Sequence, residues 1–195
     1  QTMDPHAGNS APVLSFLNNV YEGLVRRNRD MAIEGSLAES WEPLEGENGW
    51  RFNLRQGVTF ADGAAFDAED VLFSYQRASN EAADVRSWFA PVTEVRVVDD
   101  FTVDFITSAP NPLFPDSIAN FMILDKDWAE GNDAALPARD AENFATMNTN
   151  GTGPFTLASR DPGVEPVLVP NPNWWGEVEH NVTAAVFSPI GNAAT

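Results

Sequence analysis

The chain has no cysteine among its 195 residues. Disulfides, thiol catalysis and cysteine-rich metal sites are therefore excluded, although the compartment stays open because an exported protein need not contain disulfides. Histidine is also scarce, with only His6 and His180 in the sequence. Neither has a partner at metal-ligand spacing, so we expect both to be surface or turn residues, and we expect no bound metal and no cofactor.

Basic residues are few: 11 lysines and arginines stand against 29 aspartates and glutamates, which gives a net charge of −18. A nucleic-acid-binding surface needs a basic stripe, and the scattered cations form none, so we expect no nucleic-acid partner. Long hydrophobic runs are missing as well, since no stretch approaches the roughly 20 apolar residues that span a bilayer. Hydrophobic residues nevertheless make up 43% of the chain, which indicates a folded globular protein.

Motifs that would indicate catalysis are also absent. No serine lies in a Gly-x-Ser-x-Gly elbow, and the segment 151–154 (GTGP) lacks the lysine of a phosphate-binding loop. The acidic residues between Asp62 and Asp70 do not have the alternating spacing of a calcium loop. A secreted hydrolase that uses a carboxylate pair remains an alternative, but nothing in the sequence selects two carboxylates from 29.

The clearest local pattern lies in residues 49–78. Trp50, Phe52 and Leu54 alternate with polar residues, which is the two-residue repeat of a half-buried strand. After a turn at residues 62–63 comes Asp67, which we expect to cap a helix whose first acidic residues favour the positive end of the helix dipole. The acidic residues of this stretch therefore have a structural explanation.

Elsewhere the pattern alternates between hairpins and short helices. From Val13 onward, apolar residues at helical spacing predict one long helix that includes Tyr21 and Leu24 and ends at Arg26 and Arg27. We expect three antiparallel pairs and four further elements: 40–43 with 50–54, 92–98 with 102–106, 155–159 with 167–169, helices at 113–119, 126–131 and 141–147, and a final strand at 184–187. This mixture predicts an α+β fold, a mixed sheet with β-hairpins and interspersed helices.

The stretch 54–74, LRQGVTFADGAAFDAEDVLFS, resembles a segment typical of the extracellular solute-binding proteins of family 5, the peptide/nickel class of receptors for ABC importers. Further matches occur in the family's order along the chain: Asp4-Pro5, Tyr21-Glu22-Gly23-Leu24, Leu37-Ala38-Glu39-Ser40-Trp41, Gly151-Thr152-Gly153-Pro154-Phe155 and Asn171-Pro172-Asn173-Trp174-Trp175-Gly176. Because six matches keep the same order from Asp4 to Gly176, the resemblance is specific.

The resemblance implies part of lobe one of a two-lobe, periplasmic-binding-protein-like (type II) fold. Residues 1–37 and 149–195 would belong to the lobe-one core, and residues 38–148 would form an inserted α+β subdomain. Family members are much longer, so we expect the second lobe to be absent from this chain. The resemblance also implies export to the periplasm, with a signal peptide that is not in this chain.

The function implied is that of a non-catalytic receptor, a monomer that captures peptide or a similar small solute between two lobes and delivers it to an ABC permease in the inner membrane. A nickel or metal-chelate receptor of the same family is the nearer alternative. It is less favoured because no arginine lies near Phe121, where nickel-binding relatives have one. A binding module that works without a second lobe is a third possibility.

Three segments match regions where family members approach their ligand, and they supply the candidate site residues: Asn9, Ser10 and Ala11, then Arg86 and Trp88, then Asn120 and Phe121. An aromatic ring with amide groups suits a partly apolar pocket, and loops on a rigid scaffold often bind ligands. The alternative for Trp88 is that it covers the subdomain core. Trp174 and Trp175 could form an aromatic platform, but we expect them to be a structural anchor for the last strand.

Overall fold

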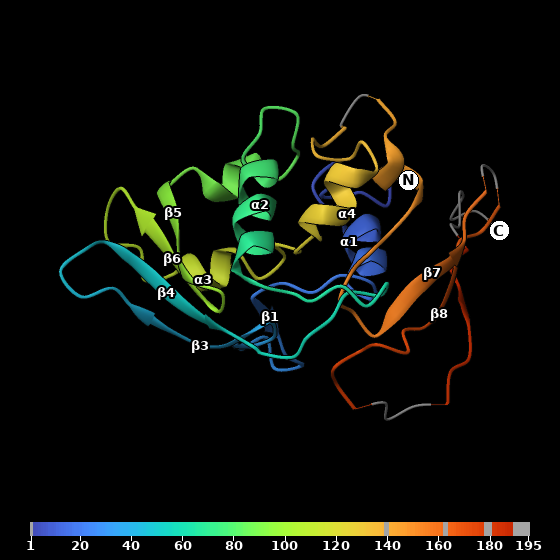
Figure 1. Ribbon diagram of the computed structural model, residues 1–195, viewed down its shortest axis with the longest axis horizontal. Helices are drawn as coiled ribbons and strands as arrows, with labels where there is room; N and C mark the ends of the chain where they lie inside the picture. Colours follow the sequence, from blue (N-terminus) through green and yellow to red (C-terminus); the bar gives the residue numbers. More distant parts are fainter. Residues whose placement is uncertain (1, 139–140, 162–163, 178–180, 189–195) are drawn as a thin grey trace.

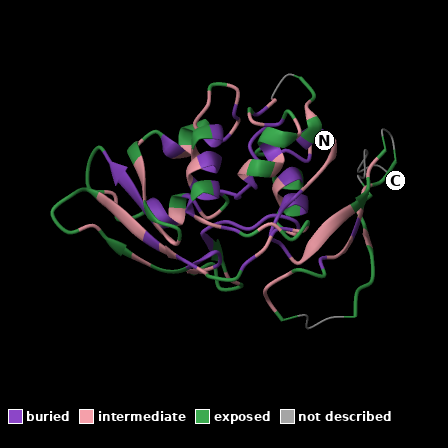
Figure 2. Cartoon of the chain, viewed as in Figure 1, coloured by how far each residue is buried: buried purple, intermediate pink, exposed green. Residues whose placement is uncertain are grey.

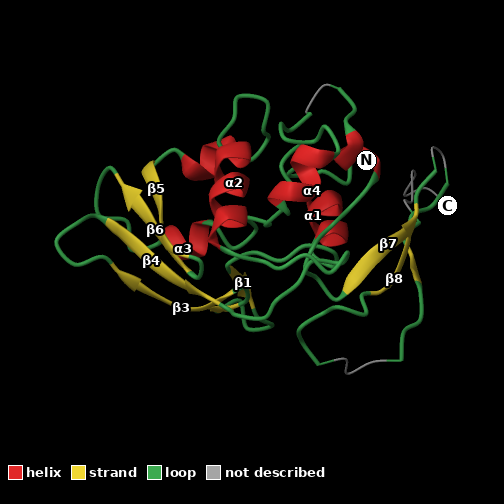
Figure 3. Ribbon diagram, in the orientation of Figure 1, coloured by secondary structure: helices red, strands yellow, loops and turns green. Residues whose placement is uncertain are grey.

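The computed structural model describes residues 2–138, 141–161, 164–177 and 181–188, and it has an α+β architecture (Figures 1 and 3). In chain order its elements are α1 (Ala11–Leu17), β1 (Val25–Arg27), β2 (Ile33–Gly35), β3 (Ala38–Pro43), β4 (Gly49–Leu54), α2 (Ala68–Ala78), the 3-10 helix η1 (Arg86–Phe89), β5 (Val92–Asp99), β6 (Thr102–Thr107), α3 (Phe114–Ser117), α4 (Lys126–Gly131), α5 (Phe144–Met147), β7 (Phe155–Ser159), β8 (Val167–Pro170) and β9 (Ala185–Val186).

A four-stranded antiparallel sheet with the order β3-β4-β6-β5 forms one end of the molecule (Figure 1). Two of the expected hairpins, β3 with β4 and β5 with β6, are confirmed, and pairing of β4 with β6 joins them into one sheet. Phe52 and Leu54 are buried, whereas Arg51 points to the other face and binds Asp104 through two hydrogen bonds of 2.7 and 2.8 Å. The alternation in the sequence therefore matches the two faces of the sheet.

Helix α2 covers this sheet, and its start follows the sequence prediction. The Asp67 carboxylate accepts a hydrogen bond from the Glu69 amide at 2.8 Å, and Asp70 in turn accepts from the Asp67 amide at 3.0 Å. This reciprocal capping box satisfies amides that would otherwise lack a partner. Tyr75 on the helix packs edge-on against Phe105 of β6, so the helix and the sheet share one apolar core.

A second apolar core surrounds α1 and includes residues from α4, β8 and the segment 122–124. Phe16 of α1 contacts Phe187 edge-on, with 4.7 Å between the ring centroids. Figure 2 shows buried residues on one part of each helix, on β6 of the four-stranded sheet and on the chain that runs between the helices, whereas the loops at the rim are largely exposed. The third expected hairpin, β7 with β8, is confirmed beside this core and is joined by β9.

The long first helix predicted from Val13 to Arg27 is wrong: α1 ends at Leu17. The side-chain amide of Asn19 donates to the carbonyls of Ser15 and Phe16, which removes the acceptors at the helix end from further helical pairing. A turn at residues 18–20 follows, and after it the chain finds its partners elsewhere. Val20 accepts from the Gly153 amide at 2.9 Å, and Gly23 pairs with Met122.

The shorter elements agree with the prediction to different degrees. The helix expected at 126–131 is confirmed, as is burial of the segment 121–124. The helices expected at 113–119 and 141–147 are shortened to one turn each, Phe114–Ser117 and Phe144–Met147, and the final strand is shortened to Ala185–Val186. Isolated single turns are marginal in water, so packing rather than helix propensity stabilises them.

The segment 151–154 is a site of close backbone approach. A Cβ atom placed on Gly153 would lie 2.7 Å from the Val20 carbonyl oxygen and 2.8 Å from that of Asn19. Gly151 is equally confined, because its Cβ would clash with the Val20 carbonyl oxygen. These glycines therefore let two extended segments meet, which explains the glycine-rich sequence without a phosphate ligand.

We predict that Gly153→Ala lowers the free energy of unfolding by about 1–3 kcal/mol, because the added methyl group forces the two backbones apart. The matched control is Gly131→Ala, where a Cβ would meet no atom within 4 Å. Urea unfolding of both variants measures the difference. An equal loss of stability in the two variants would contradict the close-approach explanation.

Candidate functional site

The first two candidate segments lie side by side in the structure. Asn9, Ser10 and Ala11 are exposed at the start of α1, where Ser10 holds the N-cap position. The side-chain amide of Asn9 donates to the backbone carbonyl of Asp84 at 3.2 Å. Because Asp84 lies two residues before the start of η1, the loop before α1 is bonded to the turn that leads to Arg86 and Trp88.

Arg86 lines an open cavity of about 580 Å³, whereas Trp88 is not among the residues that line it. The lining comes from the end of α2, the following turn, η1 and the start of β5: Tyr75, Ser79, Ala83, Asp84, Arg86, Ser87, Phe89, Ala90 and Val92. Arg86 is exposed, and within the described part of the chain it makes no ion pair. Trp88 is half-buried against the apolar core of the sheet, so it serves that core and exposes only part of its ring.

The third segment is divided between two environments. Phe121 is 1% exposed and packs edge-on against Phe89, with 4.8 Å between ring centroids, so it supports the candidate surface from beneath. Asn120 is exposed, but it lines a different cavity of about 420 Å³ with Tyr21 and Glu22. The structure thus links the loop of Asn9 to the turn of Asp84, and Phe121 to Phe89, but of the candidate residues only Arg86 lines this cavity.

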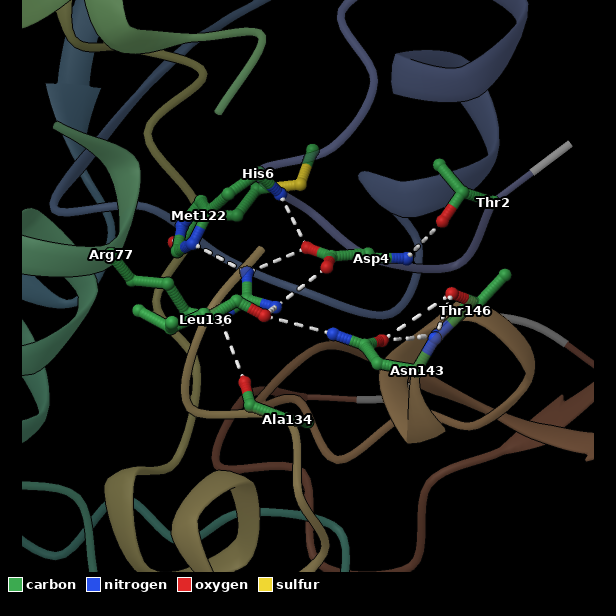
Figure 4. A network of polar contacts seen from close by, with 9 residues as sticks. All are labelled: Thr2, Asp4, His6, Arg77, Met122, Ala134, Leu136, Asn143 and Thr146. Atoms are coloured by element: carbon green, nitrogen blue, oxygen red, sulfur yellow. Dashed lines mark hydrogen bonds and ion pairs between the residues drawn. The ribbon is translucent and has the colours of Figure 1, made fainter. Parts of the chain in front are cut away.

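Beneath this surface lies a buried polar network that sequence reasoning missed (Figure 4). The guanidinium of Arg77 binds both carboxylate oxygens of Asp4 at 2.6 Å, and both side chains are 0% exposed. The same Nη1 atom of Arg77 lies 3.0 Å from Nδ1 of His6. Asp4 and Arg77 are 73 positions apart in sequence, so no local pattern could have indicated the pair.

His6 lies in a turn, as one of the two predicted alternatives has it, but it is 1% exposed and therefore not a surface residue. Arginine can only donate hydrogen bonds, so Nδ1 of His6 must accept from Arg77. The proton of the neutral ring is therefore on Nε2, which donates to the Met122 carbonyl at 3.0 Å. The ring also stacks on Phe121, with centroids 6.1 Å apart. His180 lies outside the described residues.

The electrostatics of the network follow from burial and from the charge of Arg77. Burial, and then the neighbouring guanidinium, lower the pKa of His6 to about 4. Burial by itself would raise the pKa of Asp4, but the hydrogen bonds and charge of Arg77 outweigh it and lower that pKa. At neutral pH the network therefore contains one carboxylate, one guanidinium and one neutral imidazole.

Trp175 has a structural role on another part of the molecule. Its Nε1 donates to Oε2 of Glu22 at 2.7 Å, and the guanidinium carbon of Arg55 lies 4.2 Å from the centre of its ring. Burial raises the pKa of Glu22, while hydrogen bonding to Trp175 opposes that rise. Trp175 is thus an anchor, as expected, but the contacts that fix it are with Glu22 and Arg55 and not with the last strand.

Two further findings concern metals and membranes. The described residues contain no group of three or more histidines, aspartates or glutamates placed to hold a metal ion. None of the helices in the described ranges is long and apolar enough to cross a membrane.

Residues 32–195 match the family model described as "Bacterial extracellular solute-binding proteins, family 5 Middle". The chain belongs to this family. A curated relative, the "Probable D,D-dipeptide-binding periplasmic protein DdpA" of Escherichia coli strain K12, is 33% identical across the whole of this chain. The family-5 chain spans 38% of the length of that relative.

Solved structures confirm the fold. AgaA from A. tumefaciens R10, in complex with agropinic acid, has a TM-score of 0.83 and 22% identity over 96% of this chain and 37% of its own. NikZ from Campylobacter jejuni, in complex with Ni(L-His), has a TM-score of 0.78 and 23% identity over 90% of this chain and 34% of its own. The curated relatives are named as binding proteins and not as enzymes, which leaves the hydrolase alternative without support.

We predict a pH-dependent stability difference between the parent and His6→Gln. The His6 pKa falls from 6.5 to about 4 on folding, so between these values the unfolded state binds a proton that the folded state does not. The contribution of His6 to the free energy of unfolding is fully present above pH 6.5. It falls by roughly 3 kcal/mol as the pH is lowered to 4. Urea unfolding at pH 7, 5.5 and 4 should therefore show the parent losing about that much more stability than the variant.

Subtraction of the variant from the parent is needed because Asp70 titrates in the same range. Burial raises the pKa of Asp70 to about 7, so its contribution to stability falls as pH rises, opposite to that of His6. Asp70 is common to both proteins and cancels in the difference. If stability changed in parallel with pH in the two proteins, His6 would not be the buried neutral group described.

Proposed function

We propose that the chain forms part of the first lobe of a periplasmic, monomeric solute-binding protein that captures a short peptide and delivers it to an ABC permease in the inner membrane. The observation that carries this proposal is the 33% identity to the D,D-dipeptide-binding relative, which extends over the whole chain. The candidate surface supports it, because exposed amide and guanidinium groups can pair with the carbonyls and carboxylate of a peptide.

The proposed division of the lobe assigns residues 1–37 and 149–195 to the lobe core and residues 38–148 to an inserted subdomain. All four strands of the β3-β4-β6-β5 sheet lie within 38–148, which supports the division. Leu24, Val25 and Leu37 share one apolar cluster with that sheet, so we expect the two parts to move together. Closure would then occur between this lobe and a second lobe formed by other residues. A ligand that binds the closed state more tightly than the open state would shift the equilibrium toward closure.

The proposed ligand surface consists of Asn9, Ser10 and Ala11, with Arg86 and the exposed part of Trp88. Arg86 supplies a guanidinium that no carboxylate of the described chain occupies. In the same cavity, the ring of Phe89 is buried and rests on Phe121. A metal-chelate ligand has less support, because the likeness to NikZ is one of fold alone.

The test uses protein expressed from the complete reading frame that encodes this chain. Isothermal titration calorimetry with D-alanyl-D-alanine and with L-alanyl-L-alanine should show saturable binding of at least one, with a Kd in the micromolar range or tighter, which corresponds to about −8 kcal/mol. Nickel with L-histidine is the competing probe. If the protein bound the nickel–histidine complex and neither dipeptide, the ligand would be a metal chelate and not a peptide. Release of free alanine from a dipeptide would indicate a hydrolase.

We predict that Arg86→Ala weakens binding of the dipeptide by about 10- to 100-fold, because a hydrogen bond between charged groups contributes roughly 1.5–3 kcal/mol. The control is Arg29→Ala, which removes an exposed arginine from the turn between β1 and β2. The same titrations measure both variants. Equal affinity of the Arg86 and Arg29 variants would remove Arg86 from the ligand surface.

A further inference from the structure

Arg77 occupies the last turn of α2 and is 1% exposed, so it cannot contact a ligand. Its guanidinium contacts two other segments of the chain, residues 4–6 and residues 134–136. Besides Asp4 and His6, it donates from Nε to the Ala134 carbonyl at 3.0 Å and from Nη2 to the Leu136 carbonyl at 3.2 Å. Figure 4 shows these groups converging on the side chain from different directions.

The contacts of Arg77 continue to the first candidate segment through the backbone. The Asp4 carboxylate, held by Arg77, accepts from the His6 amide at 2.9 Å. The His6 carbonyl then accepts from the Asp84 amide at 2.9 Å, and the Asp84 carbonyl accepts from the side chain of Asn9. The loop that carries Asn9 is therefore bonded to the turn before η1 at two points, both within a few residues of the ion pair.

The His6 ring carries the contacts to the third candidate segment. Its Nδ1 accepts from Arg77 while its Nε2 donates to Met122, so the ring orientation is fixed at both nitrogens. In that orientation it stacks on Phe121, which packs edge-on against Phe89 of η1. Each of the three candidate segments is thus linked indirectly to the Arg77 guanidinium: Asn9 through Asp84 and His6, and Phe89 and Phe121 through the His6 ring.

Stability alone does not explain a charge at this position. A buried ion pair recovers by attraction about what it loses by desolvation, and apolar residues of similar volume are often equally stable. The property that an apolar side chain lacks is direction, because a guanidinium presents five donors in a fixed plane. Here that plane sets the positions of a carboxylate, an imidazole and two carbonyls at once.

We propose that Arg77 is the positioning residue of the ligand surface: by orienting Asp4 and His6 it holds the loop of Asn9 against the turn of Asp84, and so sets the affinity for peptide. This inference rests on the proposed function, because it assigns Arg77 a role in that same site. The role assigned to Arg77 goes beyond the proposed function, because it makes ligand affinity depend on a residue that the ligand never touches.

Two variants of the complete protein test the proposal. Arg77→Lys keeps the charge but loses the planar, two-point contact with Asp4. The double variant Asp4→Asn, Arg77→Met removes the ion pair without leaving an unpaired buried charge, so it should fold even if the lysine variant does not. Arg51→Lys is the chemically matched control, since Arg51 also binds one aspartate through two hydrogen bonds, but on the outer face of the sheet.

The readouts are affinity for D-alanyl-D-alanine and L-alanyl-L-alanine by calorimetry, and hydrogen exchange by mass spectrometry. Both Arg77 variants should bind the dipeptide at least tenfold more weakly than the parent, with faster exchange in residues 4–11 and 84–89. The Arg51 variant should retain parental affinity and exchange in those residues. Gly153→Ala serves as a second control, because it destabilises the fold away from the network and should leave affinity unchanged.

Parental affinity in the double variant, or an equal loss of affinity in the Arg51 or Gly153 controls, would overturn the positioning role. If the parent bound neither dipeptide, the proposed function would fail, but hydrogen exchange would still decide the role of Arg77. Exchange in residues 4–11 that was unchanged by both Arg77 variants would then reject it.

Discussion

The ion pair between Arg77 and Asp4 is the constraint on which the rest of the structure depends. Arg77 belongs to α2, which packs on the four-stranded sheet, whereas Asp4 lies in the N-terminal segment that leads into α1 and the second core. Leaving either charge buried without its partner would cost several kcal/mol. The pair therefore fixes how the two apolar cores meet, and the candidate ligand surface lies where they do.

Much of the fold could be predicted from the sequence because its determinants are local. The alternation around Phe52 needs only the two faces of a strand, and the cap at Asp67 needs only the amides of the next residues. The error at Tyr21 has the opposite cause. Its spacing from Leu14 and Leu17 fits a helix, but Val20 and Gly23 find their partners at Gly153 and Met122, which lie far away in the sequence.

The candidate site shows the same limit at the scale of single residues. The resemblance selects whole segments and not the orientation of their side chains: Phe121 is buried beneath the candidate surface, while its neighbour Asn120, in the turn after α3, is exposed and lines another cavity. The sequence indicates a surface or turn position for His6 because no partner stands near it in the chain, whereas Arg77, 71 positions away, is the partner that it meets in the interior. Contacts between residues so far apart leave no local pattern, so the structure was needed to show which side chains are buried and which are exposed.

Charge connects this geometry to the kind of ligand the surface suits. The chain carries a net charge of −18, but at physiological salt the field of distant carboxylates is screened within about 8 Å, so the groups that line the cavity dominate. Of the residues that line it, Arg86 is exposed and makes no ion pair within the described part of the chain. Its guanidinium can therefore pair with an anionic group of a ligand. The position of Arg86 depends in turn on the preceding Asp84, whose backbone is hydrogen-bonded to His6 and to the side chain of Asn9.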